Sequence, residues 1–232
     1  MVHHVGDSNC INIAIDGPAG AGKSTVARKV AEQIGYVYID TGSMYRAVTL
    51  IAQRAGVTAD QTAKLAELVR SLELELEPGE QGQSVFVNGE NVTALIRTRE
   101  VTLQVSHFAA NETVREVLGI MQRKLAERKG VVMDGRDIGS HVLPNAELKI
   151  FLTASVKERA LRRYREVTDS QTVSLAQLEA EIAERDRLDE QRDISPLICA
   201  SDAVVLDSTA MTIDEVIYAI VKLSRTKMAE AK

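Results

Sequence analysis

The feature that most constrains this chain is a glycine-rich segment that lies between an apolar run and a helical pattern. Residues 17–25 read GPAGAGKST, after the apolar run 10–15 and before apolar residues at helical spacing from Val26 to Ile34. Glycines let backbone N–H groups converge on phosphate oxygens, and the following helix directs its positive end at the same anion. The lysine of this motif reaches the β- and γ-phosphates, and its serine ligates Mg²⁺. The segment predicts a nucleoside triphosphate site formed by Gly17, Pro18, Ala19, Gly20, Ala21, Gly22, Lys23, Ser24 and Thr25.

Composition narrows the class of protein and its partners. The net charge of −5 argues against a general nucleic-acid binder, because backbone binding needs a basic face. The two cysteines, Cys10 and Cys199, have neither the spacing of a metal site nor a disulfide framework, so we expect both to be buried thiols in a cytoplasmic protein. No apolar run is long enough to span a membrane, and residues 1–10 are expected to form a flexible tail without a secretory signal.

Apolar runs alternate with helical patterns along most of the chain, which indicates a parallel sheet covered by helices. Together with the glycine-rich loop this predicts a P-loop NTPase-type, three-layer α/β fold. The expected strands are 11–15, 37–39, 131–133, 148–152 and 204–206. The expected helices are 23–34, 43–54, 63–70, 113–128, 156–167, 174–187 and 212–223.

One stretch departs from this alternation. Residues 72–77 alternate leucine and glutamate, and a second apolar run at 84–87 is followed by Asn88-Gly89. Strict period-two patterning with turn residues is typical of half-exposed antiparallel strands. We therefore expect a single domain over 11–230, with an insertion at about 60–110 that carries a small antiparallel sheet.

Two carboxylates and a guanidinium follow the strand 131–133, in the segment Asp134-Gly135-Arg136-Asp137. Ligands of open parallel sheets bind at the carboxyl ends of the strands. From that position Asp134 could hold Mg²⁺ or its water shell, and Arg136 could bind a phosphate through two hydrogen bonds. The alternative is a surface turn held by local ion pairs.

A second group of arginines lies in the helical region from Arg159 to Arg192. Arg185, Asp189 and Arg192 fall on one helical face by their spacings of four and three. Because phosphoryl transfer depends mainly on positioning two anions and neutralising charge, this region predicts a helical lid over about 156–192. Charge-rich helices that merely face solvent are the alternative.

Four segments together resemble bacterial cytidylate kinases, a family of nucleoside monophosphate kinases. They are Gly17 to Thr25, then Asp40-Thr41-Gly42-Ser43-Met44-Tyr45-Arg46, then Asp134-Gly135-Arg136-Asp137-Ile138-Gly139, and last Glu184-Arg185-Asp186 with Asp189 and Arg192. The second and third segments separate this family from adenylate and guanylate kinases. The resemblance extends from near residue 11 to near residue 224, and it accounts for the insertion as an enlarged monophosphate-binding region. Ser43 occupies a place that the family more often fills with alanine.

The resemblance implies transfer of the γ-phosphoryl group of ATP to CMP or dCMP with Mg²⁺, held by Ser24 and Asp134. We also expect a monomer. Lys23, Arg136, Arg185 and Arg192 would be catalytic. The residues implied to bind CMP are Thr41, Arg46, Ser106, Arg115, Arg136, Asp137, Arg185, Asp189 and Arg192. A carboxylate such as Asp137 would suit the exocyclic amine of cytosine, and it would be left unpaired against uracil.

Two other functions compete with this one. A GTP-dependent switch would share the phosphate loop, but the sequence has no Asn-Lys-x-Asp segment for guanine and would leave the arginines without a role. A nucleotide-sensing module without turnover would keep the pocket and lose transfer. The choice between CMP and dCMP stays open.

Overall fold

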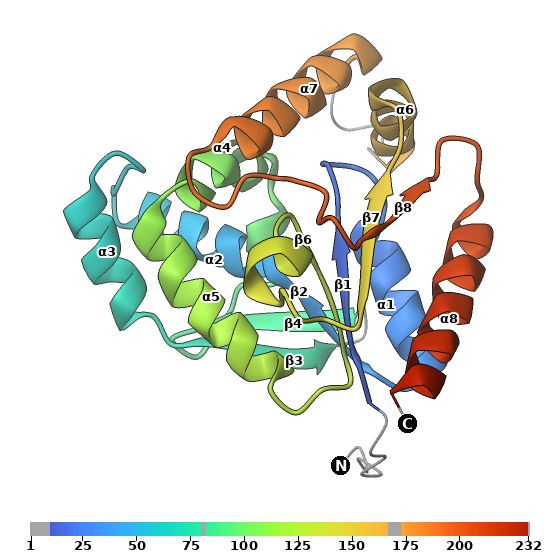
Figure 1. The fold of residues 1–232 in the computed structure, drawn as a ribbon. Coiled ribbons are helices and arrows are strands. Elements are labelled where there is room, and N and C mark those ends of the chain that lie inside the picture. The colour runs from blue at the N-terminus through green and yellow to red at the C-terminus, as the bar shows by residue number, and fades with distance from the viewer. Residues whose placement is uncertain (1–9, 80–81, 167–172, 232) are drawn as a thin grey trace.

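The central sheet positions every segment of the site. The computed structural model describes residues 10–79, 82–166 and 173–231. Its five parallel strands lie in the order β2 (Val37–Asp40), β6 (Val131–Gly135), β1 (Asn12–Asp16), β7 (Leu148–Thr153) and β8 (Val204–Asp207), as Figure 1 shows. The parallel sheet and all of its predicted strands are confirmed. Residues 1–9, most of the expected tail, lie outside the described residues.

Helices cover both faces of this sheet, which explains why its strands are apolar on both sides. In β1, Ile13 and Ile15 point into a core formed with α1 (Lys23–Ile34) and α8 (Ile213–Glu230). Between them Ala14 points to the opposite face, where it packs with Met133. On that side lie α2 (Thr41–Arg54) and α5 (Glu112–Ala126) (Figure 1). The expected three layers are therefore present.

The stretch of alternating leucine and glutamate forms the small antiparallel sheet that its pattern predicts. The strands β3 (Leu74–Gly79), β4 (Gly82–Val87) and β5 (Glu90–Asn91) pair in that order. Leu74 and Leu76 pack against a second core, while Glu75 and Glu77 are exposed. This core also takes residues from α3 (Thr62–Ser71) and from α2 and α5, so the insertion packs onto two helices of the main domain.

Sequence patterning missed one helix in the insertion. A short 3₁₀ turn, Leu95–Arg97, leads into α4 (Arg99–Ala109), which buries Val101, Val105 and Phe108. These three residues follow helical spacing, but the helix has no side-chain hydrogen bond at its N-cap residue Thr98 to signal its start. A second missed element is a π-helical turn, Ile138–Val142, directly after the Asp-Gly-Arg-Asp segment.

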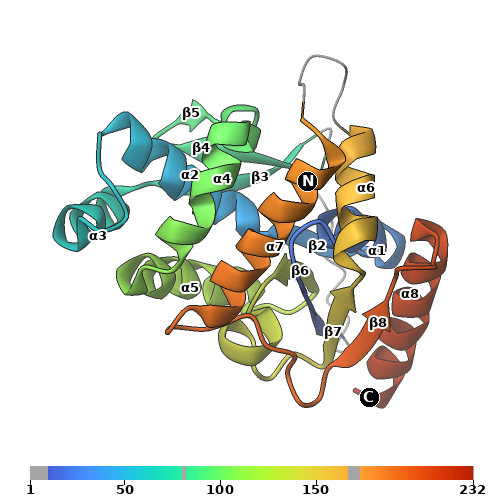
Figure 2. The same ribbon diagram turned by 90° about the horizontal axis from the view of Figure 1, so that it is seen from above.

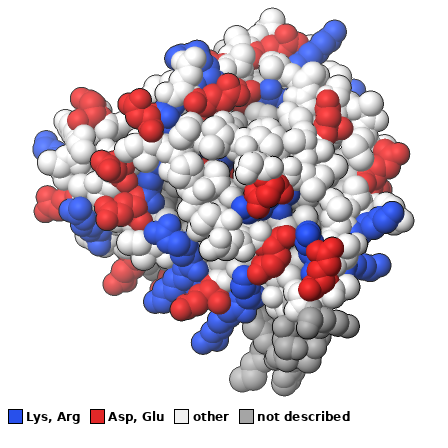
Figure 3. All heavy atoms as spheres, viewed as in Figure 1, with Lys and Arg blue, Asp and Glu red and all other residues white. Residues whose placement is uncertain are grey.

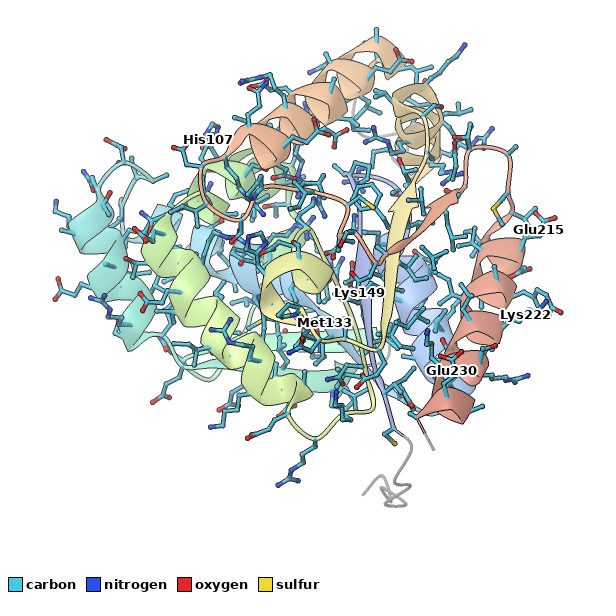
Figure 4. The ribbon with its side chains drawn as sticks, viewed as in Figure 1. His107, Met133, Lys149, Glu215, Lys222 and Glu230 are labelled. Atoms are coloured by element: carbon cyan, nitrogen blue, oxygen red, sulfur yellow. The ribbon has the colours of Figure 1, made fainter. Side chains whose placement is uncertain are left out.

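The C-terminal third supplies a helical cover. α6 (Val156–Glu166) and α7 (Leu175–Gln191) pack together through Ala160, Leu178 and Ile182, above the carboxyl end of the sheet (Figure 2). α8 begins with a capping box between Thr212 and Glu215, which Figure 4 labels at the start of that helix. α7 and α8 end four and seven residues later than predicted, at 191 and 230.

The surface corrects one expectation. Cys199 is exposed and Cys10 is half-buried, so the prediction that both thiols are buried is wrong. On the face drawn in Figure 3, acidic and basic side chains are interspersed. Of the helices in the described residues, none combines the length with the apolar character needed to cross a membrane.

Candidate active site

The glycine-rich loop connects β1 to α1 and passes very close to the neighbouring strand. Gly17 has a φ of 148°, and a Cβ added there would lie 2.0 Å from the carbonyl oxygen of Leu152, so only glycine fits. Gly22 precedes α1 in a left-handed conformation. The loop therefore lies at the amino end of α1, with the helix dipole directed at it.

Lys23 is buried at the base of this loop, with 6% of its surface exposed. Its Nζ donates a hydrogen bond of 2.8 Å to the carbonyl oxygen of Pro18. Burial, followed by the nearby positive charge of Arg136, holds the pKa of Lys23 well below its usual value. An anion in the loop would favour the charged ammonium.

Ser24 and Asp134 meet at the carboxyl edge of the sheet, as the sequence predicts. The hydroxyl of Ser24 donates to Oδ2 of Asp134 at 2.9 Å, and the hydroxyl of Tyr38 donates to Oδ1 at 3.0 Å. Burial and then the carboxylate of Asp40 raise the pKa of Asp134 to about 7. Burial and a neighbouring carboxylate favour the protonated form of Asp134, and a bound cation would stabilise its charged form.

This donor set fits Mg²⁺, which takes one or two protein oxygens and completes its shell with water and phosphate. Within the described residues, no cluster of three histidine, cysteine or acidic side chains forms a self-contained metal site. Ser24 and Asp134 would hold the ion only together with a bound phosphate. Tyr38 was missed by sequence analysis, because its place in the short strand β2 gives no sign that it faces Asp134.

Several arginines line the same cleft as the glycine-rich loop, and three of those that the sequence predicts as site residues come from distant segments. They are Arg46 on α2, Arg136 after β6 and Arg185 on α7. Within the described residues, the Nε atoms of Arg46 and Arg185 are buried without a hydrogen-bond partner. Burial, then the charges of Arg136 and Arg46, lowers the pKa of Arg185 to about 9. Burial also lowers the pKa of Arg46. Such a cluster of like charges requires an anion.

A second cavity adjoins this cleft. Sequence analysis predicted most of the polar residues that line it, namely Thr41, Ser106, Arg115, Arg136, Asp137, Arg185, Asp189 and Arg192. Arg136 and Arg185 line both cavities, so the two spaces meet at these guanidinium groups. Arg46 is the exception, because it lines the cleft of the glycine-rich loop and not this pocket.

Charged pairs inside the pocket fix its side chains. Arg115 binds Asp137 and stacks over the ring of Tyr45, with 5.3 Å from its Cζ to the ring centroid. The second carboxylate oxygen of Asp137 lies 3.7 Å from Arg192. Asp137 therefore faces two guanidinium groups and has less free acceptor capacity than its sequence position implies. The motif Asp-Thr-Gly-x-x-Tyr-Arg contains Tyr45, but its spacing does not reveal the stacking.

Asp189 links three parts of the site. Its carboxylate accepts a hydrogen bond of 2.8 Å from Nε of Arg136 and one of 3.0 Å from the hydroxyl of Ser106. The pKa of Asp189 is lowered although burial opposes this, because Arg136, Arg185 and Arg192 surround it. The predicted face of α7 with Asp189 thus points into the site. The alternative of helices that merely face solvent is excluded for this face.

Asp40 and Arg97 lie at the edge of the cleft. Asp40 caps α2 by accepting from the backbone N–H of Ser43 at 3.0 Å and from its hydroxyl at 2.5 Å. The serine that departs from the resembling family therefore holds the capping carboxylate. Arg97, which sequence analysis did not single out, lies 3.3 Å from the same carboxylate and lines the cleft.

Comparison with known proteins agrees with this geometry. The family model for cytidylate kinase matches residues 13–226. A curated cytidylate kinase from Lysinibacillus sphaericus (strain C3-41) is 54% identical over 222 residues, covering 94% of this chain and 98% of its own length. One from Exiguobacterium sibiricum is 55% identical over 215 residues, covering 92% and 96%.

Among solved structures, an uncharacterized protein from Eubacterium ventriosum superposes with a TM-score of 0.51 at 12% identity, covering 93% of this chain and 98% of that one. That likeness concerns the fold alone. The match of the family model and the identity of the curated relatives extend over both the glycine-rich loop and the arginine-lined pocket. The chain belongs to the cytidylate kinase family.

Proposed function

We propose that this chain transfers the γ-phosphoryl group of ATP to CMP or dCMP, forming ADP and CDP or dCDP, in pyrimidine nucleotide metabolism. The observation that carries this proposal is the position of Arg136 and Arg185, which line both the cleft of the phosphate loop and the adjoining pocket. Two anions bound in these cavities meet at the same guanidinium groups. Transfer between phosphates needs this arrangement, because alignment and charge neutralisation supply most of the catalysis.

On the donor side, residues 17–25 hold the triphosphate of ATP through backbone N–H groups, and Lys23 contacts its outer phosphates. Ser24 and Asp134 would hold Mg²⁺. Their side chains are hydrogen-bonded to each other next to the loop. When bound, Mg²⁺ neutralises phosphate charge and orients the oxygens for displacement. Tyr38 holds the carboxylate of Asp134 in place for this role.

On the acceptor side, Arg46 and Arg136 bind the phosphate of CMP, while Arg185 and Arg192 offset the charge that passes between the substrates. Among the residues that the structure describes, the buried Nε of Arg185 has no hydrogen-bond partner, so it is free to donate to a phosphate oxygen. Asp189 lies toward the sugar and keeps Arg136 in position. No strong general base is needed, because the acceptor phosphate is an anion in a loose transition state.

Thr41, Ser106, Arg115 and Asp137 form the end of the pocket that takes the base. Asp137 accepts from the exocyclic amine of cytosine and is held for this by Arg115. Uracil would present a carbonyl oxygen to the same carboxylate, so UMP is a poorer acceptor. Arg115 and Ser106 can donate to the O2 carbonyl, which both pyrimidines carry, and to N3 of cytosine, whereas N3 of uracil carries a hydrogen and does not accept.

The helices α6 and α7 act as the lid of this site. They cover the carboxyl end of the sheet, where water admitted to an occupied triphosphate site would cause hydrolysis. We further propose a cytoplasmic monomer. One chain supplies the arginines of both cavities, and both cysteines are free thiols, which suits a reducing compartment.

A steady-state assay tests the proposed function. With ATP and Mg²⁺ fixed, the purified protein should phosphorylate CMP and dCMP and give much lower kcat/KM for UMP and AMP. Repeated turnover of CMP distinguishes a kinase from a sensing module, which would bind both nucleotides without forming product. A GTP-dependent switch would instead hydrolyse or exchange GTP and leave CMP unchanged, and that outcome would refute the proposal.

A further inference from the structure

The backbone N–H and the carbonyl oxygen of one residue in the phosphate loop are both hydrogen-bonded to side chains of the lid helices. The N–H of Ala19 donates to Oδ1 of Asp186 on α7 at 3.0 Å, and its carbonyl oxygen accepts from Nη1 of Arg159 on α6 at 2.7 Å. The same Nη1 donates to Oδ2 of Asp186 at 2.6 Å. Ala19, Asp186 and Arg159 thus form a closed ring of hydrogen bonds, which we call the latch.

The latch is buried, unlike the ion pairs on the outer faces of these two helices. Arg159 is 4% exposed and Asp186 is 8% exposed. By contrast, the Arg163–Glu166 and Arg187–Glu184 pairs are about half exposed on both sides. Removing one partner of a buried, hydrogen-bonded pair leaves the other charge unpaired and costly, whereas exposed pairs contribute little. A glycine at position 20 allows the close approach, since a Cβ there would lie 3.3 Å from Cβ of Arg159.

The latch also couples the position of α7 to that of the phosphate loop. Asp186 follows Arg185 directly on α7, and Asp189, less than one turn later, holds Arg136 at 2.8 Å. Fixing Asp186 against Ala19 therefore sets how far the arginines of α7 stand from the phosphate loop. Arg159 is tied to the sheet as well, because its Nε donates to the carbonyl oxygen of Ala154 at 2.8 Å.

We propose that Arg159 and Asp186 are positioning residues for phosphoryl transfer, which act by fixing the phosphate loop against the lid and do not touch either substrate themselves. This inference rests on the proposed kinase function. Loss of the latch misplaces Arg185 relative to the donor phosphates. A misplacement of about 1 Å costs on the order of 10²-fold in rate. CMP alone does not contact the phosphate loop, and Arg185, Asp189 and Arg192 of its pocket move together with α7, so its binding is affected less than transfer.

The experiment uses the full chain with Arg159→Met, Asp186→Ala and the double variant, and Arg187→Met on the exposed side of α7 as the matched control. We expect kcat for CMP to fall about 10²-fold in each single variant. The Kd of CMP without ATP, measured by calorimetry, should change less than about threefold. Because the latch is one unit, the double variant should lose little more than either single variant. Arg187→Met should match the wild type.

Several outcomes would overturn the proposal. A kcat within about twofold of the wild type, with only a lower Tm, would show that the latch is merely structural. Fully multiplicative losses in the double variant would show that the two residues act separately. If Asp186→Ala does not fold, Asp186→Asn decides, since its amide oxygen still accepts from Ala19 while the charge is lost. An unchanged kcat in that variant refutes the role, and a wild type that does not phosphorylate CMP refutes the proposed function instead.

Discussion

The hydroxyl of Ser24 donates to Oδ2 of Asp134 at 2.9 Å, although the two residues are 110 positions apart. Strand register brings them together. β1 and β6 pair in parallel so that Asp16 lies opposite Gly135, and Ser24 follows β1 through the phosphate loop. Because β2 pairs with β6 in the same way, Asp40 lies opposite Asp134. The carboxyl edge of the sheet therefore gathers oxygen ligands beside the phosphate loop.

Asp134→Asn should raise the free Mg²⁺ concentration at half-maximal rate by about tenfold or more, because one anionic oxygen ligand is lost. The measurement is a Mg²⁺ titration of CMP phosphorylation at saturating ATP, paired with Mn²⁺ binding to the protein·ATP complex by electron paramagnetic resonance. Tyr38→Phe, which keeps the carboxylate and frees one of its oxygens, should give a smaller shift. Unchanged Mn²⁺ affinity in Asp134→Asn would remove this residue from the metal site.

Lys23→Met should lower kcat by about 10²- to 10³-fold, because an ammonium group placed against developing phosphate charge is lost. The side chain is buried, so its effect on folding must be measured as well. Methionine is of similar length and carries no charge, and burial already disfavours the charged form of Lys23 in the free protein. We therefore expect the Tm of the free variant to stay near that of the wild type. An unaltered kcat would exclude Lys23 from the mechanism.

Arg185→Met should separate stability from binding. Burial among Arg136 and Arg46 lowers the pKa of Arg185 to about 9, so its charge opposes folding of the free protein. The Tm of the variant without ligand should equal or exceed that of the wild type. ATP raises the Tm by binding the native state, and this rise should be smaller in the variant. Differential scanning fluorimetry with Arg187→Met as control measures both; a normal rise with ATP would contradict the role.

Much of the fold follows from local pattern. Each predicted strand and helix is present, and the period-two run at 72–77 forms antiparallel structure. The helix α4 was missed because its apolar spacing lies inside a region that the neighbouring strand pattern dominates. Its buried face, with Val105 and Phe108, faces a core that forms only when the insertion packs against α2 and α5. Helices with weak caps are specified more by such packing than by their own sequence.

The residues of the site likewise divide into those that local sequence identifies and those that only the folded structure brings together. Residues that carry chemistry stand in motifs, so Arg136, Asp137 and Asp189 could be named from sequence. Their partners could not. That Arg115 pairs with Asp137, or that Arg159 and Asp186 grip Ala19, depends on contacts between segments far apart in the chain. Sequence spacing also gives no sign of burial, so the motif identifies Lys23 without showing that it is buried at the base of the loop.

Asp137→Asn should erode the preference for CMP over UMP. The amide is nearly isosteric, but its NH₂ group can donate to the carbonyl oxygen of uracil, whereas the carboxylate cannot. The variant also loses the ion pair with Arg115, which should lower the activity with both substrates. The informative quantity is therefore the ratio of kcat/KM for CMP to that for UMP, which should fall by about tenfold or more. A constant ratio would move base recognition to other residues.

Asp16 should make stability depend on pH. Its carboxylate accepts from the N–H groups of Ile138 at 2.8 Å and Gly139 at 2.7 Å, yet burial raises its pKa from 3.8 to about 6. Between these values the native state holds a proton that the unfolded chain has released. The stabilising contribution is therefore full below the unfolded pKa and is lost as pH rises through the folded one, by on the order of 3 kcal/mol.

The matched variant is Asp16→Asn, which cannot titrate at this position. Urea unfolding of both proteins at several pH values between about 4 and 7 gives the difference in their free energies of unfolding. Groups that titrate equally in both proteins cancel in this difference. The wild type should become less stable relative to Asp16→Asn as pH rises through this range, because only the wild type must then bury a charged carboxylate. A difference that stays constant over the range would mean that Asp16 is ionised in the native state throughout, and that its two backbone hydrogen bonds outweigh burial.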